Sequence, residues 1–202
     1  MAMRGMYRRI KGAPFVSAIL AAVNVVVFFL VELGMSRLYS RGILRASDVL
    51  YRGEYGRILW AMFLHSGIDH LFNNMLLVLF MGAMLEREIG HISFALVYFL
   101  SGIVGNTVSV WFRFRMGDMA GSLGASGAVF GMDGLLLALV LFSRRRMQSV
   151  TPVRVILMIV LSLYSGFSSA NVDNTAHVGG LVTGFLLGLI WCAIDRLRAA
   201  DQ

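Results

Sequence analysis

Gly124-Ala125-Ser126-Gly127-Ala128-Val129-Phe130-Gly131 is the stretch around which this chain is organised. A serine stands there among small residues, at the start of an apolar run that reaches Phe142. Glycines at 127, 131 and 134 recur at helical spacing and leave one helix face without side chains, along which a second helix can pack closely. Ser126 would then lie at a helix N-terminus, where free backbone N–H groups bind anions. This position suits a nucleophile if a base reaches it.

The composition predicts that this stretch belongs to a membrane protein. The chain has 202 residues, of which 58% are hydrophobic and only 14% are charged, and its mean hydropathy is +0.76. Several long apolar runs in one chain are typical of a polytopic membrane protein. The net charge of +7 comes from basic residues that flank these runs, so we expect membrane lipids rather than nucleic acid as partners. The single cysteine, Cys192, excludes an intramolecular disulfide and a cysteine-based metal site.

The apolar runs predict an all-α membrane protein of six spans, forming one domain over residues 1–202. Residues 1–13 would be a short basic segment, and the six-span core would cover about 14–195. The first run is longer than the apolar part of a signal peptide, and no clear cleavage site follows it. Arginines and apolar residues alternate in the connection after it, which we expect to lie partly helical in the membrane interface. The expected spans run from about Pro14 to Leu33, His70 to Leu85, Ile92 to Trp111, Ser126 to before Arg144, Val153 to Phe167 and Ala176 to Ile194.

The distribution of basic residues predicts the orientation of these spans. Six spans place both termini on one side of the membrane. The segments on that side hold 11 of the 18 lysines and arginines, including the run from Arg144 to Arg146, and the opposite segments hold seven. Because basic residues accumulate on the cytoplasmic side, we predict that both termini are cytoplasmic and that the chain lies in the cytoplasmic (inner) membrane.

Polar residues occur at the outer ends of the second, fourth and sixth spans, which all run from outside to inside. Such residues are costly in a membrane and suggest function. His70 and Asn74 are four residues apart, so they share one face of the second span, and both can donate hydrogen bonds to a developing oxyanion. Ser126 opens the fourth span and His177 the sixth.

Glycines in the sixth span predict that His177 lies close to Ser126. Gly180, Gly184 and Gly188 follow the histidine at a strict four-residue repeat, and this bare ridge can pack against the glycine face of the fourth span. The sequence then supplies a nucleophile, a base and hydrogen-bond donors. No third acidic residue is evident, so we predict a Ser–His dyad.

With these residues the chain resembles the rhomboid family of intramembrane serine proteases. The matching elements are Gly124-Ala125-Ser126-Gly127, His70-x-x-x-Asn74 and Ala176-His177-Val178-Gly179-Gly180 with Gly184, in the family's order and across its six-span core. The resemblance implies that Ser126 is the nucleophile and His177 the general base. It also implies an oxyanion hole made by His70, Asn74 and the backbone N–H of Ser126. It implies structural support from Gly124, Gly127, Gly180, Gly184, Arg57 and Glu86.

The chain departs from the family's pattern at three positions. Gly56 replaces the Trp of a Trp-Arg motif in the first loop, which leaves the anchoring of that loop open. Phe130 stands where many members have a Tyr that packs on the catalytic histidine, and its ring can still stack. Asp133 lies two turns below Ser126, where the family usually has an apolar residue, and its role is open.

The resemblance implies an endopeptidase that cuts single-span membrane proteins and needs neither a metal nor an organic cofactor. Two alternatives stay open: a rhomboid-like pseudoprotease that binds membrane helices without cleaving them, and a small membrane transporter or channel. Intact Ser126 and His177 argue against the first alternative. The second would favour an internal repeat or spans broken near the midplane, and the sequence has neither. For His65, just before the second span, we favour a loop-fixing role.

Overall fold

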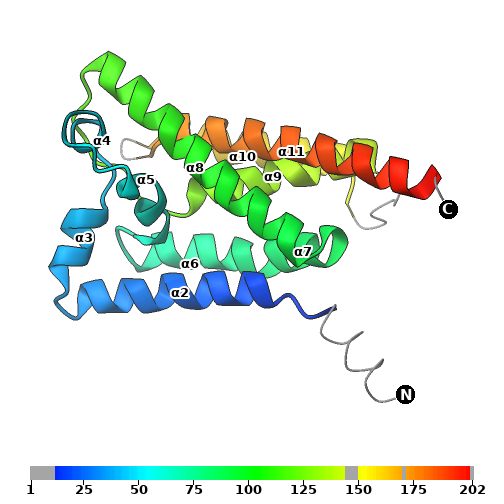
Figure 1. Cartoon of the computed structure of the whole chain (residues 1–202), viewed down its shortest axis with the longest axis horizontal. Helices are drawn as coiled ribbons and strands as arrows, with labels where there is room; N and C mark the ends of the chain where they lie inside the picture. The colour runs from blue at the N-terminus through cyan, green and yellow to red at the C-terminus, as the bar shows by residue number, and fades with distance from the viewer. Residues whose placement is uncertain (1–11, 144–149, 170–171, 201–202) are drawn as a thin grey trace.

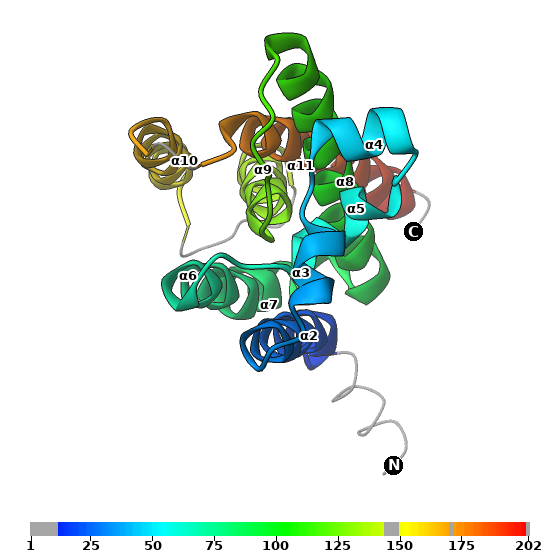
Figure 2. The same ribbon diagram turned by 90° about the vertical axis from the view of Figure 1, so that its left-hand side faces the viewer.

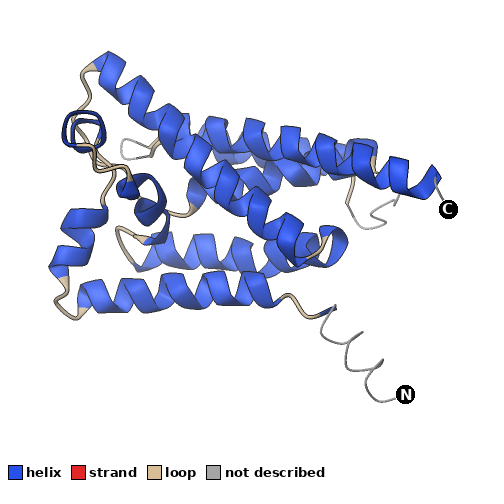
Figure 3. Ribbon diagram, in the orientation of Figure 1, coloured by secondary structure: helices blue, strands red, loops and turns tan. Residues whose placement is uncertain are grey.

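The computed structural model describes residues 12–143, 150–169 and 172–200. Within these ranges the regular structure is helical, apart from an isolated antiparallel bridge between Leu44 and Ser122 (Figure 3). The expected all-α fold is therefore confirmed. The helices are α2 (Phe15–Glu32), α3 (Ser36–Gly42), α4 (Ala46–Arg52), α5 (Gly56–Trp60), η1 (Ala61–Phe63), α6 (Ile68–Leu77), η2 (Val78–Gly82), α7 (Ala83–Ile89), α8 (His91–Met116), α9 (Ser126–Phe142), α10 (Pro152–Phe167) and α11 (Asn174–Ala200).

Six rods of helix make up the membrane bundle. Among the described residues, α2, the continuous rod Ile68–Ile89, α8 and α11 are each long and apolar enough to cross a membrane, and α9 and α10 are shorter apolar helices. The rod Ile68–Ile89 joins α6 to α7 through the π-helical turn η2. The beginning of α2 and the end of α11 lie at the same end of the bundle (Figure 1). An even number of spans requires this arrangement.

Several helices are longer than their apolar runs. The second rod continues to Ile89, α8 to Met116 and α11 to Ala200, because polar residues at span ends can reach the interface while the backbone stays helical. The arginine run Arg144 to Arg146 and residues 1–11 of the basic N-terminal segment lie outside the described residues.

Helix α9 is the centre of the bundle. Figure 2, which looks along the bundle, shows α9 with α8, α10, α11 and α6 around it. Twelve of its 17 residues are buried. Its small residues allow this, because neighbouring backbones can approach closely where side chains are missing. The outer helices instead expose large apolar side chains, such as Val26 on α2 and Leu161 on α10, as a lipid-facing surface requires.

Residues 33–67, called loop 1 below, form a small packed unit at the end of the bundle where α9 and α11 begin (Figure 1). As expected, the segment is largely helical, with α3, α4, α5 and η1. Leu44, Val49 and Ala61 from loop 1 form a buried cluster with Val110 of α8. Loop 1 therefore has its own apolar anchor on the bundle and is not a free linker.

Candidate active site

The hydroxyl of Ser126 and the imidazole of His177 are in hydrogen-bonding contact. Ser126 Oγ lies 2.8 Å from His177 Nε2, although the two residues are 51 positions apart in the chain. Ser126 is the first residue of α9, and His177 lies in the first turn of α11 and is buried. His177 Nδ1 is buried and has no hydrogen-bond partner among the described residues. The geometry is that of a two-residue Ser–His pair.

Glycines on the two helices bring this pair together. A Cβ on Gly180 would overlap the backbone oxygen of Gly127, and a Cβ on Gly184 would overlap that of Gly131. One turn further down, a Cβ on Gly188 would lie 2.6 Å from the Cβ of Ala138. The ridge expected from the sequence therefore packs directly against the backbone of α9. Because α9 and α11 touch along this whole line, the positions of Ser126 and His177 are fixed by helix packing.

Phe130 supports the imidazole from one side. Its ring stacks on His177 with a centroid distance of 4.3 Å and an interplanar angle of 18°. Phe130 lies four residues after Ser126, so it is on the same face of α9 one turn deeper. The phenyl ring thus stacks as expected, without the hydroxyl of a tyrosine.

Gly124 shapes the approach of His70 to this pair. Its φ of +127° is left-handed, a conformation that favours glycine. A Cβ at this position would also lie 2.8 Å from His70 Cε1 and Nε2 and 3.7 Å from Ser126 Oγ. The imidazole of His70 and the hydroxyl of Ser126 therefore both lie next to the space that a side chain at residue 124 would occupy, and a larger residue there would push the imidazole away.

His70 and Asn74 occupy consecutive turns of α6. Ser66 Oγ lies 3.1 Å from His70 Nδ1, which leaves Nε2 as the ring nitrogen that faces Gly124. Asn74 is buried, and its Nδ2 has no hydrogen-bond partner among the described residues. A buried amide donor without a partner is costly, and an anionic ligand would satisfy it. Sequence reasoning missed Ser66, since a serine in a loop carries no signal of which side chain it will meet.

Asp173 lies directly before α11. It is the N-cap of α11: its Oδ1 accepts a hydrogen bond from the Ala176 N–H at 3.0 Å, and its backbone oxygen accepts one from the His177 N–H at 3.1 Å. Its Oδ2 accepts a hydrogen bond from Ser109 Oγ at 2.5 Å and lies 3.3 Å from Arg113 Nε, both on α8. An aspartate three residues before an apolar helix turn was the available signal.

The electrostatics of Asp173 follow from these partners. Burial by itself raises the pKa of this carboxyl, but hydrogen bonds from Ser109, Ser122 and the Ala176 N–H, together with the Arg113 charge, outweigh burial and lower the pKa below its usual range. Asp173 is therefore a carboxylate at neutral pH. It holds the first turn of α11, which carries His177, against α8.

His65 lies beside His70 at the end of loop 1. It is buried, neither ring nitrogen has a hydrogen-bond partner among the described residues, and the two rings meet edge to face at 5.0 Å. Burial, with a smaller contribution from the charge of His70, lowers the pKa of His65 to about 3. His65 is thus neutral at physiological pH and packs against the imidazole of His70, in keeping with a loop-fixing role.

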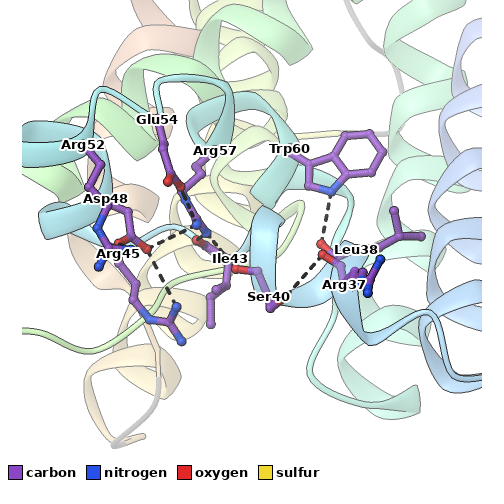
Figure 4. A network of polar contacts seen from close by, with 10 residues as sticks. All are labelled: Arg37, Leu38, Ser40, Ile43, Arg45, Asp48, Arg52, Glu54, Arg57 and Trp60. Atoms are coloured by element: carbon purple, nitrogen blue, oxygen red, sulfur yellow. Dashed lines mark hydrogen bonds and ion pairs between the residues drawn. The ribbon is translucent and has the colours of Figure 1, made fainter.

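Arg57 joins parts of loop 1 that are distant in sequence. The buried Arg57 guanidinium donates to the backbone oxygens of Ser40 at 2.9 Å and Ile43 at 2.8 Å, and it pairs with Glu54 and Asp48 (Figure 4). It therefore anchors loop 1 although Gly56 replaces the family's tryptophan.

Glu86 plays a comparable part at the opposite end of the bundle. It accepts hydrogen bonds from the N–H groups of Val16 and Ser17 at the start of α2 and from Ser17 Oγ, and it contacts His91 Nδ1 at 2.6 Å. The carboxylate satisfies free N–H groups of the first turn of α2. Glu86 therefore joins α7 to the beginning of α2.

Asp133 and possible metal ligands lie outside the Ser–His pair. Asp133 is buried in α9 and has no hydrogen bond or ion pair within the described residues, and nothing in the structure explains it. No group of three or more His, Cys, Asp or Glu side chains suited to a metal ion occurs in ranges 12–143, 150–169 and 172–200.

The fold and this geometry define a class: a multi-pass helical membrane protein with a Ser–His pair at the ends of two packed helices. The chain belongs to the rhomboid family, since residues 52–194 match the rhomboid domain. It is 33% identical over 179 residues to the rhomboid protease GluP of Bacillus subtilis (strain 168), which covers 87% of this chain and 34% of that protein.

Two further relatives agree with this assignment. The chain is 39% identical over 156 residues to RHOMBOID-like protein 4 of Arabidopsis thaliana, which covers 76% of this chain and 38% of that protein. It is 36% identical over 139 residues to the putative rhomboid protease YdcA of Bacillus subtilis (strain 168), which covers 68% of each chain. The chain thus spans well under half the length of GluP and of RHOMBOID-like protein 4.

Proposed function

We propose that this chain is an intramembrane serine endopeptidase whose catalytic dyad is Ser126 and His177. The observation that carries the proposal is the 2.8 Å contact between Ser126 Oγ and His177 Nε2. His177 Nε2 takes the hydroxyl proton as Ser126 Oγ attacks the carbonyl carbon of the scissile peptide bond. His177 then gives that proton to the leaving amine, and water, deprotonated by the same nitrogen, hydrolyses the acyl-enzyme. The unpartnered Nδ1 of His177 supports a dyad rather than a triad.

The developing oxyanion would be held by three donors. We assign these roles to the Ser126 backbone N–H, the Asn74 amide and the Nε2–H of His70. In the His70 tautomer that this requires, the Ser66 hydroxyl donates to Nδ1 and leaves the proton on Nε2. The unsatisfied Asn74 Nδ2 and the position of Ser126 at the positive end of the α9 dipole support the same assignment.

The substrates would be single-span membrane proteins. An apolar cavity of about 420 Å³ lies between the α6–α7 rod and α10, lined by residues such as Leu77, Phe80 and Met158, with α9 contributing Leu136. Apart from Arg154 its lining is apolar, so apolar side chains of a membrane helix could enter it with little desolvation of polar groups. The exposed apolar surfaces of the outer helices support a location within the bilayer. We further propose the cytoplasmic membrane, with both termini cytoplasmic, from the basic residues of the sequence.

Labelling with a fluorophosphonate tests the proposal. Purified wild-type protein is expected to react covalently and to cleave a model single-span substrate, and Ser126→Ala and His177→Ala are expected to do neither. Ser101→Ala is the matched control, because Ser101 is a buried α8 serine with no hydrogen-bond partner among the described residues, and it should keep both activities. Labelling that survives Ser126→Ala would remove Ser126 as the nucleophile. A wild-type protein that neither labels nor cleaves would favour the helix-binding pseudoprotease.

A further inference from the structure

Loop 1 forms an open cavity that the proposed chemistry does not use. Its volume is about 740 Å³, and it is lined by residues of α3 and α5, among them Arg37, Arg41, Arg57 and Trp60, and by Glu54, just before α5. Figure 4 shows this region from close by, with the Arg57 network on one side and Trp60 beside Leu38 on the other. We call it the loop-1 cavity.

The cavity has an excess of positive charge. The charged residues that line it are Arg37, Arg41, Arg57 and Glu54, which leaves a net charge of +2, and Asp48 is the other acidic residue of Ser36–Trp60. Arg57 pairs with both acidic residues, and Arg45 and Arg52 also contact Asp48. Arg37 and Arg41 form no ion pair within the part of the chain that the structure describes. These two guanidinium groups are available for an anion, and Arg suits the oxygens of a phosphate group.

Trp60 gives the cavity an apolar part beside these charged groups. Trp60 is 37% exposed, and its Nε1 donates to the backbone oxygen of Leu38 at 3.4 Å. Its neighbour Leu59 and Leu33, at the end of α2, are also exposed. A partly exposed tryptophan with an anchored N–H is typical of the interface of a bilayer, where headgroups meet acyl chains.

Gly56 keeps the cavity open. A Cβ at this position would have no heavy atom within 4 Å, so the space beside it is empty of protein. A large side chain at residue 56 would project into that space and not into the core. The position therefore offers a way to fill the cavity without disturbing the fold.

We propose that the loop-1 cavity binds the headgroup of an anionic glycerophospholipid, with its phosphodiester on Arg37 and Arg41 and its acyl chains against Trp60 and Leu59. The lipid would come from the leaflet on the side of Ser126 and would hold loop 1 at the membrane surface. The proposal concerns binding alone, so it stands or falls independently of the protease activity.

Fluorescence quenching of Trp60 tests the site locally. The protein carries Trp111→Phe and Trp191→Phe, so that Trp60 is the only tryptophan that fluoresces. It is placed in vesicles containing brominated phosphatidylglycerol or brominated phosphatidylcholine, whose bromine atoms quench this fluorescence. We expect half-maximal quenching at a lower fraction of phosphatidylglycerol than of phosphatidylcholine. Arg37→Gln with Arg41→Gln should weaken the preference roughly five-fold for each arginine. Gly56→Phe should abolish it while the unfolding temperature stays unchanged.

The control variant carries Arg52→Gln with Arg115→Gln. It loses as much positive charge as the variant with Arg37→Gln and Arg41→Gln. Arg52 and Arg115 are exposed at the same end of the molecule and do not line the cavity, so this control should keep the wild-type preference for phosphatidylglycerol. Equal quenching by the two lipids, or an equal loss of preference in the control variant, would overturn the proposal in favour of unspecific surface attraction. Relief of quenching by inorganic phosphate, but not by chloride at equal ionic strength, would overturn it in favour of a free-phosphate site.

Discussion

At the scale of single residues, the side chains around Ser126 and His177 are held by contacts that leave each one a single orientation. Phe130 covers one face of the His177 ring, Ser66 occupies one nitrogen of His70, and Gly124 leaves room for His70 to approach Ser126. Such fixed geometry matters for catalysis, because a displacement of about 1 Å can cost about a hundred-fold in rate. The residues that position Ser126 and His177 can therefore be tested in the same way as the proposed dyad itself.

Asp173 gives a residue-scale prediction with a pH dependence. Asp173→Ala removes the cap of α11 and leaves Arg113 without this partner, so we expect a loss of about 2–4 kcal/mol in the free energy of unfolding at pH 7. Asp173→Asn keeps a capping oxygen but loses the charge, and we expect a smaller loss. Because folding lowers the Asp173 pKa, its charge stabilises the protein above the unfolded-state pKa, and this contribution disappears as the pH falls through the folded-state pKa.

Thermal unfolding of the purified protein in detergent measures this effect. The difference in unfolding temperature between wild type and Asp173→Asn should be present at pH 6 and shrink below pH about 4. Asp173→Asn should retain fluorophosphonate labelling, because the first turn of α11 keeps its cap. A difference that stayed constant down to pH 3 would contradict the ionised role of Asp173.

At the scale of elements, the contact between α9 and α11 determines the site. The two helices meet backbone to backbone, with Gly180 against Gly127 and Gly184 against Gly131. The contact is not symmetric, however. A Cβ on Gly127 would lie 3.5 Å from the Ala176 backbone oxygen, an ordinary van der Waals distance, whereas a Cβ on Gly184 would overlap backbone that cannot move aside cheaply.

This asymmetry predicts opposite outcomes for two similar substitutions. Gly184→Ala should force α11 away from α9, lower the unfolding free energy by about 1–3 kcal/mol and separate His177 from Ser126, so that labelling falls sharply. Gly127→Ala should leave the unfolding temperature close to that of wild type. Thermal unfolding of both variants in the same detergent checks the prediction. Similar decreases in unfolding temperature for both variants would contradict the asymmetry of the α9–α11 contact.

At the scale of the whole molecule, the helices are attached to the bundle to very different extents. Twelve of the 17 residues of α9 are buried, but only three of the 16 residues of α10: Val155, Ile159 and Gly166. Helix α10 packs mainly on α9 and only slightly on α11, and the apolar cavity separates it from the α6–α7 rod. It stands apart from the other helices in the view along the bundle (Figure 2). We therefore expect α10 to move more easily than α9 and α11, which hold Ser126 and His177.

Amide hydrogen exchange is expected to differ between α9 and α10. Regions with few buried contacts open at low free energy, so the amides of α10 should exchange at least about ten-fold faster than those of α9 when the protein is in one detergent. The α6–α7 rod, which packs on α2 and α9, should lie between the two. Mass spectrometry of peptides from the labelled protein measures all three. Equal protection of α9 and α10 would mean that the lightly packed helix is not mobile.

The sequence by itself determined the helical class, the approximate spans, the central place of the glycine-rich helix and the expectation that His177 meets Ser126. These follow from local patterns, because apolar run length and glycine spacing act through the backbone of each helix. Only the tertiary structure decided the partners of Asp173 and Ser66, the light attachment of α10, and that Arg37 and Arg41 form no ion pair with any other described residue. The physical reason is that a polar side chain or a helix surface takes its role from neighbours distant in the chain, and spacing along the sequence does not fix those neighbours.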